Sequence, residues 1–102
     1  MASLTIVYWR DIPAQVIAKR GREAAKVQLS ERFETAIDRA AMRAGFTAAD
    51  AYLGEWRRGQ PIDCSEDLKA EVERTAERLE TEFTEERLSQ LVRASGRAEV
   101  AG

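Results

Sequence analysis

The stretch Leu4–Pro13 decides the fold; it reads LTIVYWRDIP. β-Branched and aromatic residues follow Leu4 at the next five positions, which is typical of a strand whose side chains alternate between two faces. Pro13 then ends the run, because proline lacks a backbone N–H and favours extended geometry in the residue before it. The stretch predicts a strand that ends in a turn, with the rings of Tyr8 and Trp9 on opposite faces.

Two further strand patterns follow this turn. Residues 14–19 form the first, and Gly21 supplies the positive φ that a tight hairpin turn requires. Residues 25–29 alternate apolar and polar side chains, as a strand with one solvent-facing side does. Because an isolated hairpin is marginal in water, helices are expected to cover one face of this sheet. These residues therefore predict an antiparallel sheet of two or three strands.

Apolar residues at helical spacing predict that three helices follow the sheet. The first begins at a Ser30 cap and ends at Gly45, in the usual C-terminal position of a glycine. The second is short. It follows a capping pattern at Thr47–Asp50, carries Trp56 on its apolar face and ends at residues 59–61.

The third predicted helix is long. Asp63 or Ser65 caps its start, and its apolar stripe continues to about residue 95, with a kink or restart at residues 84–86. The whole chain is thus predicted to be one α+β domain over residues 1–95: an N-terminal antiparallel two- or three-stranded sheet covered by three helices. Residues 96–102 are expected to form a frayed tail.

Composition narrows the possible functions. The 102 residues include no histidine and one cysteine, Cys64, so the usual general base and the commonest metal ligand are missing. No signal peptide is recognisable, and the apolar runs are too short to cross a membrane. We expect a cytoplasmic, non-catalytic protein without a metal site or cofactor. The glutamates of the third helix are interpreted as a solvated face rather than a metal site: Glu77, Glu80, Glu82, Glu85 and Glu86.

The first candidate surface combines the aromatic turn with the Trp-Arg-Arg sequence near residue 57. Tyr8 and Trp9 cannot both face one core, so one ring is expected inside and the other, with Trp9 favoured, at a partner; packing of both rings within the domain is the alternative. Trp and Arg are enriched among interface hot spots. The candidate partner-binding residues are Trp9, Arg10, Asp11, Ile12, Pro13, Tyr52, Trp56, Arg57 and Arg58.

The second candidate surface is the basic hairpin turn formed by Lys19, Arg20, Arg22 and Lys26. Such a turn can bind phosphates or nucleic acid, with aromatic rings as stacking platforms. The alternative is a solvated turn whose lysines discourage edge pairing. Residues 63–87 carry four Lys/Arg against ten Asp/Glu. This net charge of −6 argues against a general nucleic-acid binder.

Three segments carry a resemblance to a known family: Trp9–Val16, Val27–Phe33 and Ala51–Arg58. In this order they resemble the small bacterial family labelled "virulence factor", which is similar to a segment of the larger conserved virulence factor C. The resemblance covers roughly residues 4–83. The label describes a phenotype rather than a biochemistry, and the family provides no catalytic residues to transfer to this chain.

The resemblance also implies a metabolic setting. Free-standing members accompany one-carbon enzymes: methylenetetrahydrofolate reductase, a methyltransferase and corrinoid proteins. The first hypothesis is therefore a non-catalytic accessory subunit or assembly partner of a folate- or corrinoid-linked methyl-transfer system. The alternative is a nucleic-acid or phosphate-binding module that uses the basic hairpin turn.

Overall fold

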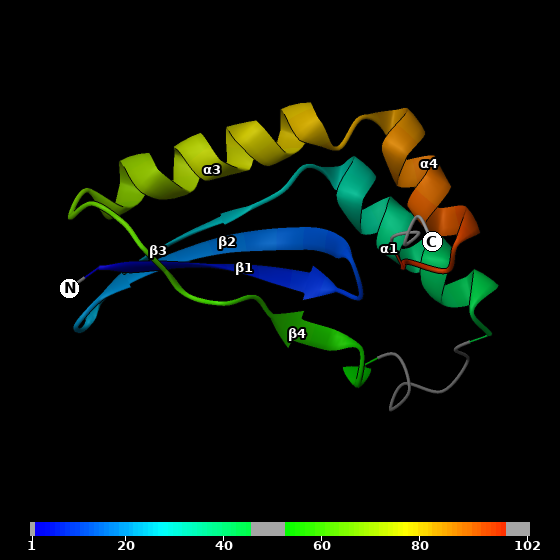
Figure 1. Ribbon diagram of the computed structural model, residues 1–102, viewed down its shortest axis with the longest axis horizontal. Coiled ribbons are helices and arrows are strands. Elements are labelled where there is room, and N and C mark those ends of the chain that lie inside the picture. The colour runs from blue at the N-terminus through cyan, green and yellow to red at the C-terminus, as the bar shows by residue number, and fades with distance from the viewer. Residues whose placement is uncertain (1, 46–52, 98–102) are drawn as a thin grey trace.

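The computed structural model of the protein describes residues 2–45 and 53–97. Its N-terminal part is an antiparallel sheet in which three consecutive strands are joined by tight turns (Figure 1). These strands are β1 (Ser3–Trp9), β2 (Ile12–Arg20) and β3 (Glu23–Gln28). Two shorter strands, β4 (Trp56–Arg58) and β5 (Ile62–Asp63), pair with the other edge of β1. The α+β prediction and the three long strands are confirmed.

The register of the sheet follows from the alternation seen in the sequence. Leu4 lies opposite Ala18 and Ile6 lies opposite Val16, so the apolar residues of β1 and β2 share one face. A bulge between Val7 and Tyr8 shifts the pairing near the turn. Bulges of this kind are common beside functional sites because they change the direction of nearby side chains.

The region of the predicted second helix differs from expectation. Trp56 lies in β4 and pairs with Trp9, whereas the sequence pattern placed it on a helix face. A main-chain contact explains the difference: the N–H of Gly59 donates to the carbonyl of Ile6 at 2.8 Å. A Cβ at Gly59 would lie only 3.2 Å from the Tyr8 ring, so glycine permits this close approach. The capping pattern at residues 47–50 lies outside the described residues.

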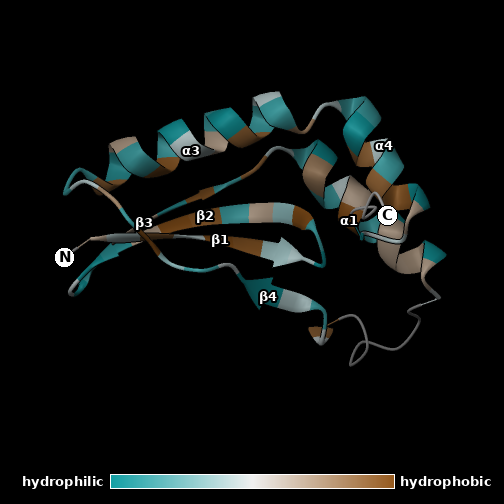
Figure 2. Ribbon diagram, in the orientation of Figure 1, coloured by the Kyte–Doolittle hydropathy of each residue, from teal (hydrophilic) through white to brown (hydrophobic). Residues whose placement is uncertain are grey.

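Three helices are present in the described residues: α1 (Glu31–Arg43), α3 (Leu68–Glu82) and α4 (Glu85–Arg93). α3 lies along one face of the sheet, while α1 and α4 pack together at the end of the sheet where β1 turns into β2 (Figure 1). Their apolar sides face inward (Figure 2). The core includes Leu4, Ile6, Val16 and Ala18 from the sheet, Leu68, Val72, Ala76 and Leu79 from α3, and Phe33, Ala36, Ile37, Ala40, Leu88 and Leu91 from α1 and α4.

The helix caps refine two of the predictions. α3 begins at Asp67, whose carboxylate accepts from the N–H of Ala70 at 3.2 Å, and not at the predicted cap. The predicted restart of the long helix is a true break, because the Thr84 hydroxyl caps α4 by accepting from the N–H of Arg87. As predicted, α1 ends before Gly45, which has a φ of 81°.

Ser30 precedes α1 but does not cap it with its side chain. Its N–H and its hydroxyl donate instead to the carboxylate of Glu80 on α3, at 2.7 and 2.8 Å. Burial of Glu80 opposes ionisation, but these two hydrogen bonds and the Arg32 guanidinium outweigh it and lower the pKa of the carboxyl. A tertiary contact thus replaces the predicted local cap and joins the start of α1 to α3.

In the described part of the chain, no helix has the length and apolar character that a membrane span requires.

Candidate functional site

The candidate site lies at the turn between β1 and β2, which consists of Arg10 and Asp11. Arg10 has a φ of 53°, a left-handed conformation that is uncommon for a residue other than glycine. Two backbone hydrogen bonds from distant segments hold the turn. The N–H of Arg10 donates to the carbonyl of Glu55 at 3.1 Å, and the N–H of Asp11 donates to the carbonyl of Gly96 at 2.8 Å.

The side chain of Arg10 is a structural part of this turn. Its guanidinium donates to the carbonyl of Ser95 at 2.8 Å and to the carboxylate of Glu55 at 3.2 Å, and it lies 5.3 Å from the ring centre of Trp9. Only 11% of the side chain is exposed. These contacts compensate for the unusual backbone conformation, so the main role of the Arg10 side chain is to stabilise the turn.

Arg57 reaches the same turn from β4. Its Nε donates to the carbonyl of Arg10 at 2.9 Å, and its Nη2 lies 3.1 Å from Asp11 Oδ1. The guanidinium also lies 4.5 Å from the ring centre of Tyr8, the residue that Arg57 faces across the strand pair. Even so, 49% of the Arg57 side chain is exposed. The fold thus joins two of the predicted segments, which are 46 residues apart, through an accessible guanidinium.

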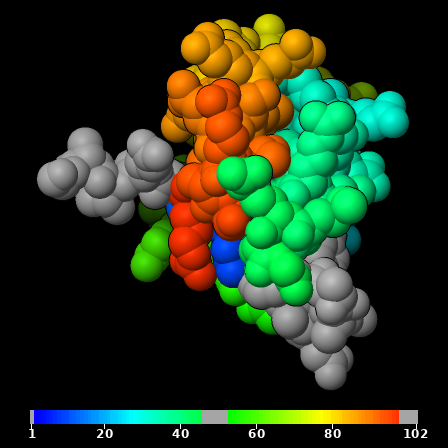
Figure 3. Space-filling view, turned by 90° about the vertical axis from the view of Figure 1, so that its right-hand side faces the viewer, coloured from blue at the N-terminus to red at the C-terminus, as the bar shows by residue number. Residues whose placement is uncertain are grey.

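The segment after α4 completes this surface. Arg97 approaches the carboxylate of Glu55 to 3.9 Å, and Glu55 also pairs with Arg10. Figure 3 views this end of the molecule, where the blue turn lies between the red C-terminal segment and the green end of α1. We call this polar group the turn surface; it consists of the exposed Arg57 and Arg97 and the partly buried Arg10, Asp11 and Glu55.

Three of the predicted partner-binding residues lie in the interior instead. Trp9 is 0% exposed, and Ile12 and Pro13 are also fully buried. The expectation that the Trp9 ring contacts a partner is therefore wrong. Tyr8 is the ring that remains half-buried, beneath Arg57. Burying an indole removes far more apolar surface from water than burying the Tyr8 ring, which can keep its polar end near solvent.

Gly96 explains how the Trp9 ring is enclosed. Its backbone has a φ of 89°, and a Cβ at this position would lie 2.7 Å from Cζ3 of Trp9. The turn after α4 therefore lies directly on the indole, and Gly96 is itself buried. Although the sequence assigned Gly96 to a frayed tail, it belongs to the folded domain.

The remaining predicted residues of the first surface are separated from the turn. Trp56 is half-buried and pairs with Trp9. Arg58 is exposed and pairs with Val7, so its side chain leaves β4 on the face opposite to that of Arg57. Tyr52 lies outside the described residues.

The basic hairpin turn divides into two parts. Lys19 and Lys26 are exposed, and the pairing of Lys19 with Ala24 and of Lys26 with Ile17 places both side chains on one face of the sheet. Arg20 belongs to the other face. It pairs with Glu23 at 2.9 Å and Glu66 at 3.0 Å, and these carboxylates raise its pKa. Arg22 lies in the exposed turn itself. The four predicted cations therefore do not form one cluster: Lys19 and Lys26 share a face of the sheet, and a ligand bound there would not contact Arg20.

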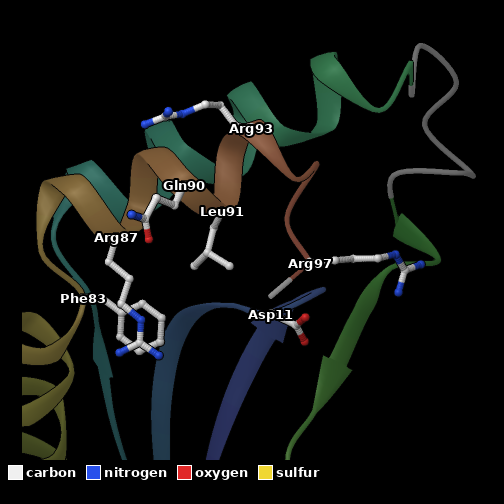
Figure 4. Close-up of a pocket in the computed structure, with 7 residues that line it drawn as sticks. All are labelled: Asp11, Phe83, Arg87, Gln90, Leu91, Arg93 and Arg97. Atoms are coloured by element: carbon white, nitrogen blue, oxygen red, sulfur yellow. The ribbon is translucent and has the colours of Figure 1, made fainter. Parts of the chain in front are cut away.

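A groove that the sequence did not predict opens beside the turn surface (Figure 4). Its volume is about 520 Å³. Figure 4 shows the Arg87 side chain over the Phe83 ring, with Gln90 and Leu91 pointing from α4 into the adjoining space. In the sequence, the groove is indicated only by the spacing of Phe83 and Arg87, which lie four residues apart on either side of the start of α4. We call this the α4 groove; it is lined by Asp11, Phe83, Arg87, Gln90, Leu91, Arg93 and Arg97.

In the described part of the chain, the cysteine and the acidic residues form no group that could hold a metal ion. Burial raises the pKa of the Cys64 thiol, and the nearby carboxylates of Glu71, Asp63 and Glu66 raise it further, which disfavours the thiolate. Of the five glutamates named in the sequence analysis, Glu80 is half-buried and the other four are exposed: Glu77, Glu82, Glu85 and Glu86.

Comparison with protein families identifies the chain. A family model described as virulence factor matches residues 7–92, which is most of the chain. The chain belongs to the virulence factor family. The match includes the β1–β2 turn, β4 and nearly all of α4, and it confirms the resemblance carried by the three sequence segments. No curated protein and no solved structure matches the chain.

Proposed function

We propose that this member of the virulence factor family is a non-catalytic interaction module that docks on a protein partner through the turn surface. One observation carries the proposal. Arg57 is anchored by Arg10 and Asp11 and stacked near Tyr8, yet half of its side chain faces solvent.

A fixed guanidinium is well suited to recognition. Arginine loses much side-chain entropy when it binds, and an arginine already held in one orientation avoids most of that loss. Arginine is also enriched among the residues that dominate interface energies. With three arginines and two carboxylates, the turn surface carries a net positive charge, so the partner is expected to present carboxylates.

The resemblance supports a choice of partner. We place it among the enzymes of folate- or corrinoid-linked methyl transfer: a methyltransferase, methylenetetrahydrofolate reductase or a corrinoid protein. The module would then act in the cytoplasm as an accessory subunit or assembly partner. The absence of histidine is consistent with a chain that supports another enzyme's chemistry.

The test is affinity capture of the tagged protein from its native host, followed by mass spectrometry, with Arg57→Ala as the test variant. Arg74→Ala is the matched control, since Arg74 is an exposed arginine on α3 that pairs with Glu71 of its own helix and, within the described residues, with no other carboxylate. We expect a methyl-transfer enzyme with the wild type and the control, and its loss with Arg57→Ala. Equal recovery with both variants would reject the turn surface, and recovery of no such enzyme by any form would reject the partner class.

The second candidate function is phosphate or nucleic-acid binding at Lys19 and Lys26. It is favoured by the sheet register, which gives these exposed lysines a common face. Half-buried Trp56 provides a fluorescence signal for titration with a single-stranded oligonucleotide over a series of salt concentrations. Affinity that falls steeply with salt, and falls again in Lys26→Ala, is expected for this function. Lack of salt-dependent binding would remove it.

A further inference from the structure

The α4 groove has a cation fixed at one end. The guanidinium carbon of Arg87 lies 4.1 Å from the ring centre of Phe83, and Nη1 reaches the carbonyl of Glu82 at 3.4 Å. Contact with the aromatic ring limits the movement of the guanidinium and leaves N–H donors along its edge. Arg87 forms no ion pair with a carboxylate of the described residues, although its neighbours at positions 85 and 86 are glutamates.

The other cations at the groove differ from Arg87. Figure 4 shows the Arg93 side chain extending away from the groove, and Arg97 directed away from Leu91. Arg97 also approaches Glu55, and the carboxylate of Asp11 is paired with Arg57. Arg87 is therefore the charge that faces the groove most directly, and the one acidic residue lining the groove is already neutralised.

Beside this cation the groove supplies a polar and an apolar contact. The side-chain amide of Gln90 can donate or accept a hydrogen bond, and Leu91 offers an aliphatic surface next to the Phe83 ring (Figure 4). The volume of about 520 Å³ falls within the range of pockets that hold small molecules. A water-filled groove of this kind would favour a ligand with one charged end and one apolar end.

We propose that the α4 groove binds a small organic anion. Its carboxylate or phosphate would accept hydrogen bonds from the edge of the Arg87 guanidinium, and its apolar part would lie on Leu91 and the exposed edge of Phe83. A charge-assisted bidentate contact gives both affinity and orientation. The groove shares Asp11 and Arg97 with the turn surface, but Arg57, the residue that carries the docking proposal, does not line the groove. Substitution of Arg87 therefore tests this site without altering Arg57.

The experiment is a two-dimensional NMR titration of the uniformly ¹⁵N-labelled full chain. Phenyl phosphate and phenylacetate are the probes, since they attach the same ring to a phosphate and to a carboxylate. Benzyl alcohol is the neutral control ligand. Arg87→Gln is the test variant. Arg78→Gln is the matched control, because Arg78 is an exposed arginine on α3 outside the groove.

We expect saturable shifts of the Arg87 Nε–H and of the Gln90 side-chain amide with at least one of the two anions, and no saturation with benzyl alcohol. The probe that binds more tightly identifies the anionic group. Removing the charge should weaken binding by about tenfold or more in Arg87→Gln, as expected for loss of a charge-assisted hydrogen bond, and leave Arg78→Gln unchanged. Three results would overturn the proposal: no saturable shift with either anion, equal binding by the neutral ligand, or unchanged affinity in Arg87→Gln.

Discussion

The β1–β2 turn and the β2–β3 turn share a backbone conformation but differ in the interactions that stabilise it. Each joins two antiparallel strands with two residues, and each begins with a residue of positive φ: 53° at Arg10 and 59° at Gly21. Gly21 lies in open space, with nothing within 4 Å of the position that a Cβ would occupy. Arg10, in contrast, is enclosed by Trp9, Glu55 and Ser95.

The difference shows two ways of forming a tight turn. At Gly21 the residue type alone permits the left-handed conformation, so the turn is a local property of the sequence. At Arg10 the same conformation is unfavourable for the residue, and hydrogen bonds from segments 45 and 85 residues away stabilise it. The β1–β2 turn thus keeps Arg10 in a strained backbone conformation, but the same contacts hold its guanidinium in place at the end of the sheet.

The largest expected effect is at the indole beneath the β1–β2 turn. Trp9→Ala should lower the free energy of unfolding by about 3–5 kcal/mol, as large aromatic truncations in cores do. Denaturant unfolding followed by circular dichroism measures it. A loss well below this range would mean that the ring contributes little to the core, and that the two turns are more alike than the structure indicates.

Gly96→Ala should have the next largest effect. The new Cβ would lie 2.7 Å from Cζ3 of Trp9, and an alanine with a φ of 89° is strained as well. The two effects together should lower the free energy of unfolding by about 2–4 kcal/mol. Gly45→Ala is the control, because its φ of 81° carries the strain without a nearby atom. Equal losses in the two variants would show that contact with Trp9 is unimportant.

Substitutions of Arg10 separate its contacts from its backbone strain. Arg10→Ala loses the hydrogen bonds to Ser95 and Glu55 but keeps the unfavourable φ, so we expect a loss of about 2 kcal/mol. Arg10→Gly loses the same contacts and relieves the strain, so it should be about 1 kcal/mol more stable than Arg10→Ala. Chemical unfolding of both variants tests this order, and the reverse order would mean that the turn is not strained in the native protein.

The smallest effect is expected at the open turn. Gly21→Ala should lower the free energy of unfolding by about 1 kcal/mol, because only the backbone conformation is affected. Gly21→Arg should lose no more than Gly21→Ala, since nothing surrounds the side chain. Thermal unfolding of both variants measures the difference. A much larger loss for arginine would reveal contacts at this turn and weaken the contrast with Arg10.

Local sequence patterns predicted helices and strands correctly where a single local preference determined the backbone conformation. The period-two alternation of residues 25–29 indicated a strand, and Gly45 indicated a helix end. The prediction failed at Trp56 because the three residues of β4 are too few for an alternation to be recognised, and the spacing of Trp56 from Leu53 also fits a helix. The Ser30 hydroxyl was predicted to accept a hydrogen bond from an N–H at the start of α1, but it donates to Glu80, 50 residues away.

The sequence identified several residues of the candidate site but not how they are arranged in space. The sequence drew attention to Arg10, Asp11 and Arg57, because arginine beside aromatic residues is typical of interfaces. It could not show that Arg57 would stack over Tyr8 and pair with Asp11, since no local rule links residues so far apart. The α4 groove escaped prediction for the same reason, because its lining combines α4 and the residues on either side of it with Asp11 of the distant β1–β2 turn.

By itself, the sequence determined the α+β class, the three long strands, and the placement of the Tyr8 and Trp9 rings on opposite faces of the first strand. These properties follow from alternation and turn chemistry, which act between near neighbours. Only the tertiary structure decided that Trp9 is the buried ring, that residues 56–58 form a strand and that Arg10 keeps a positive φ. Each of these outcomes depends on contacts between distant segments, whose combined free energy outweighs local preference once the chain has folded.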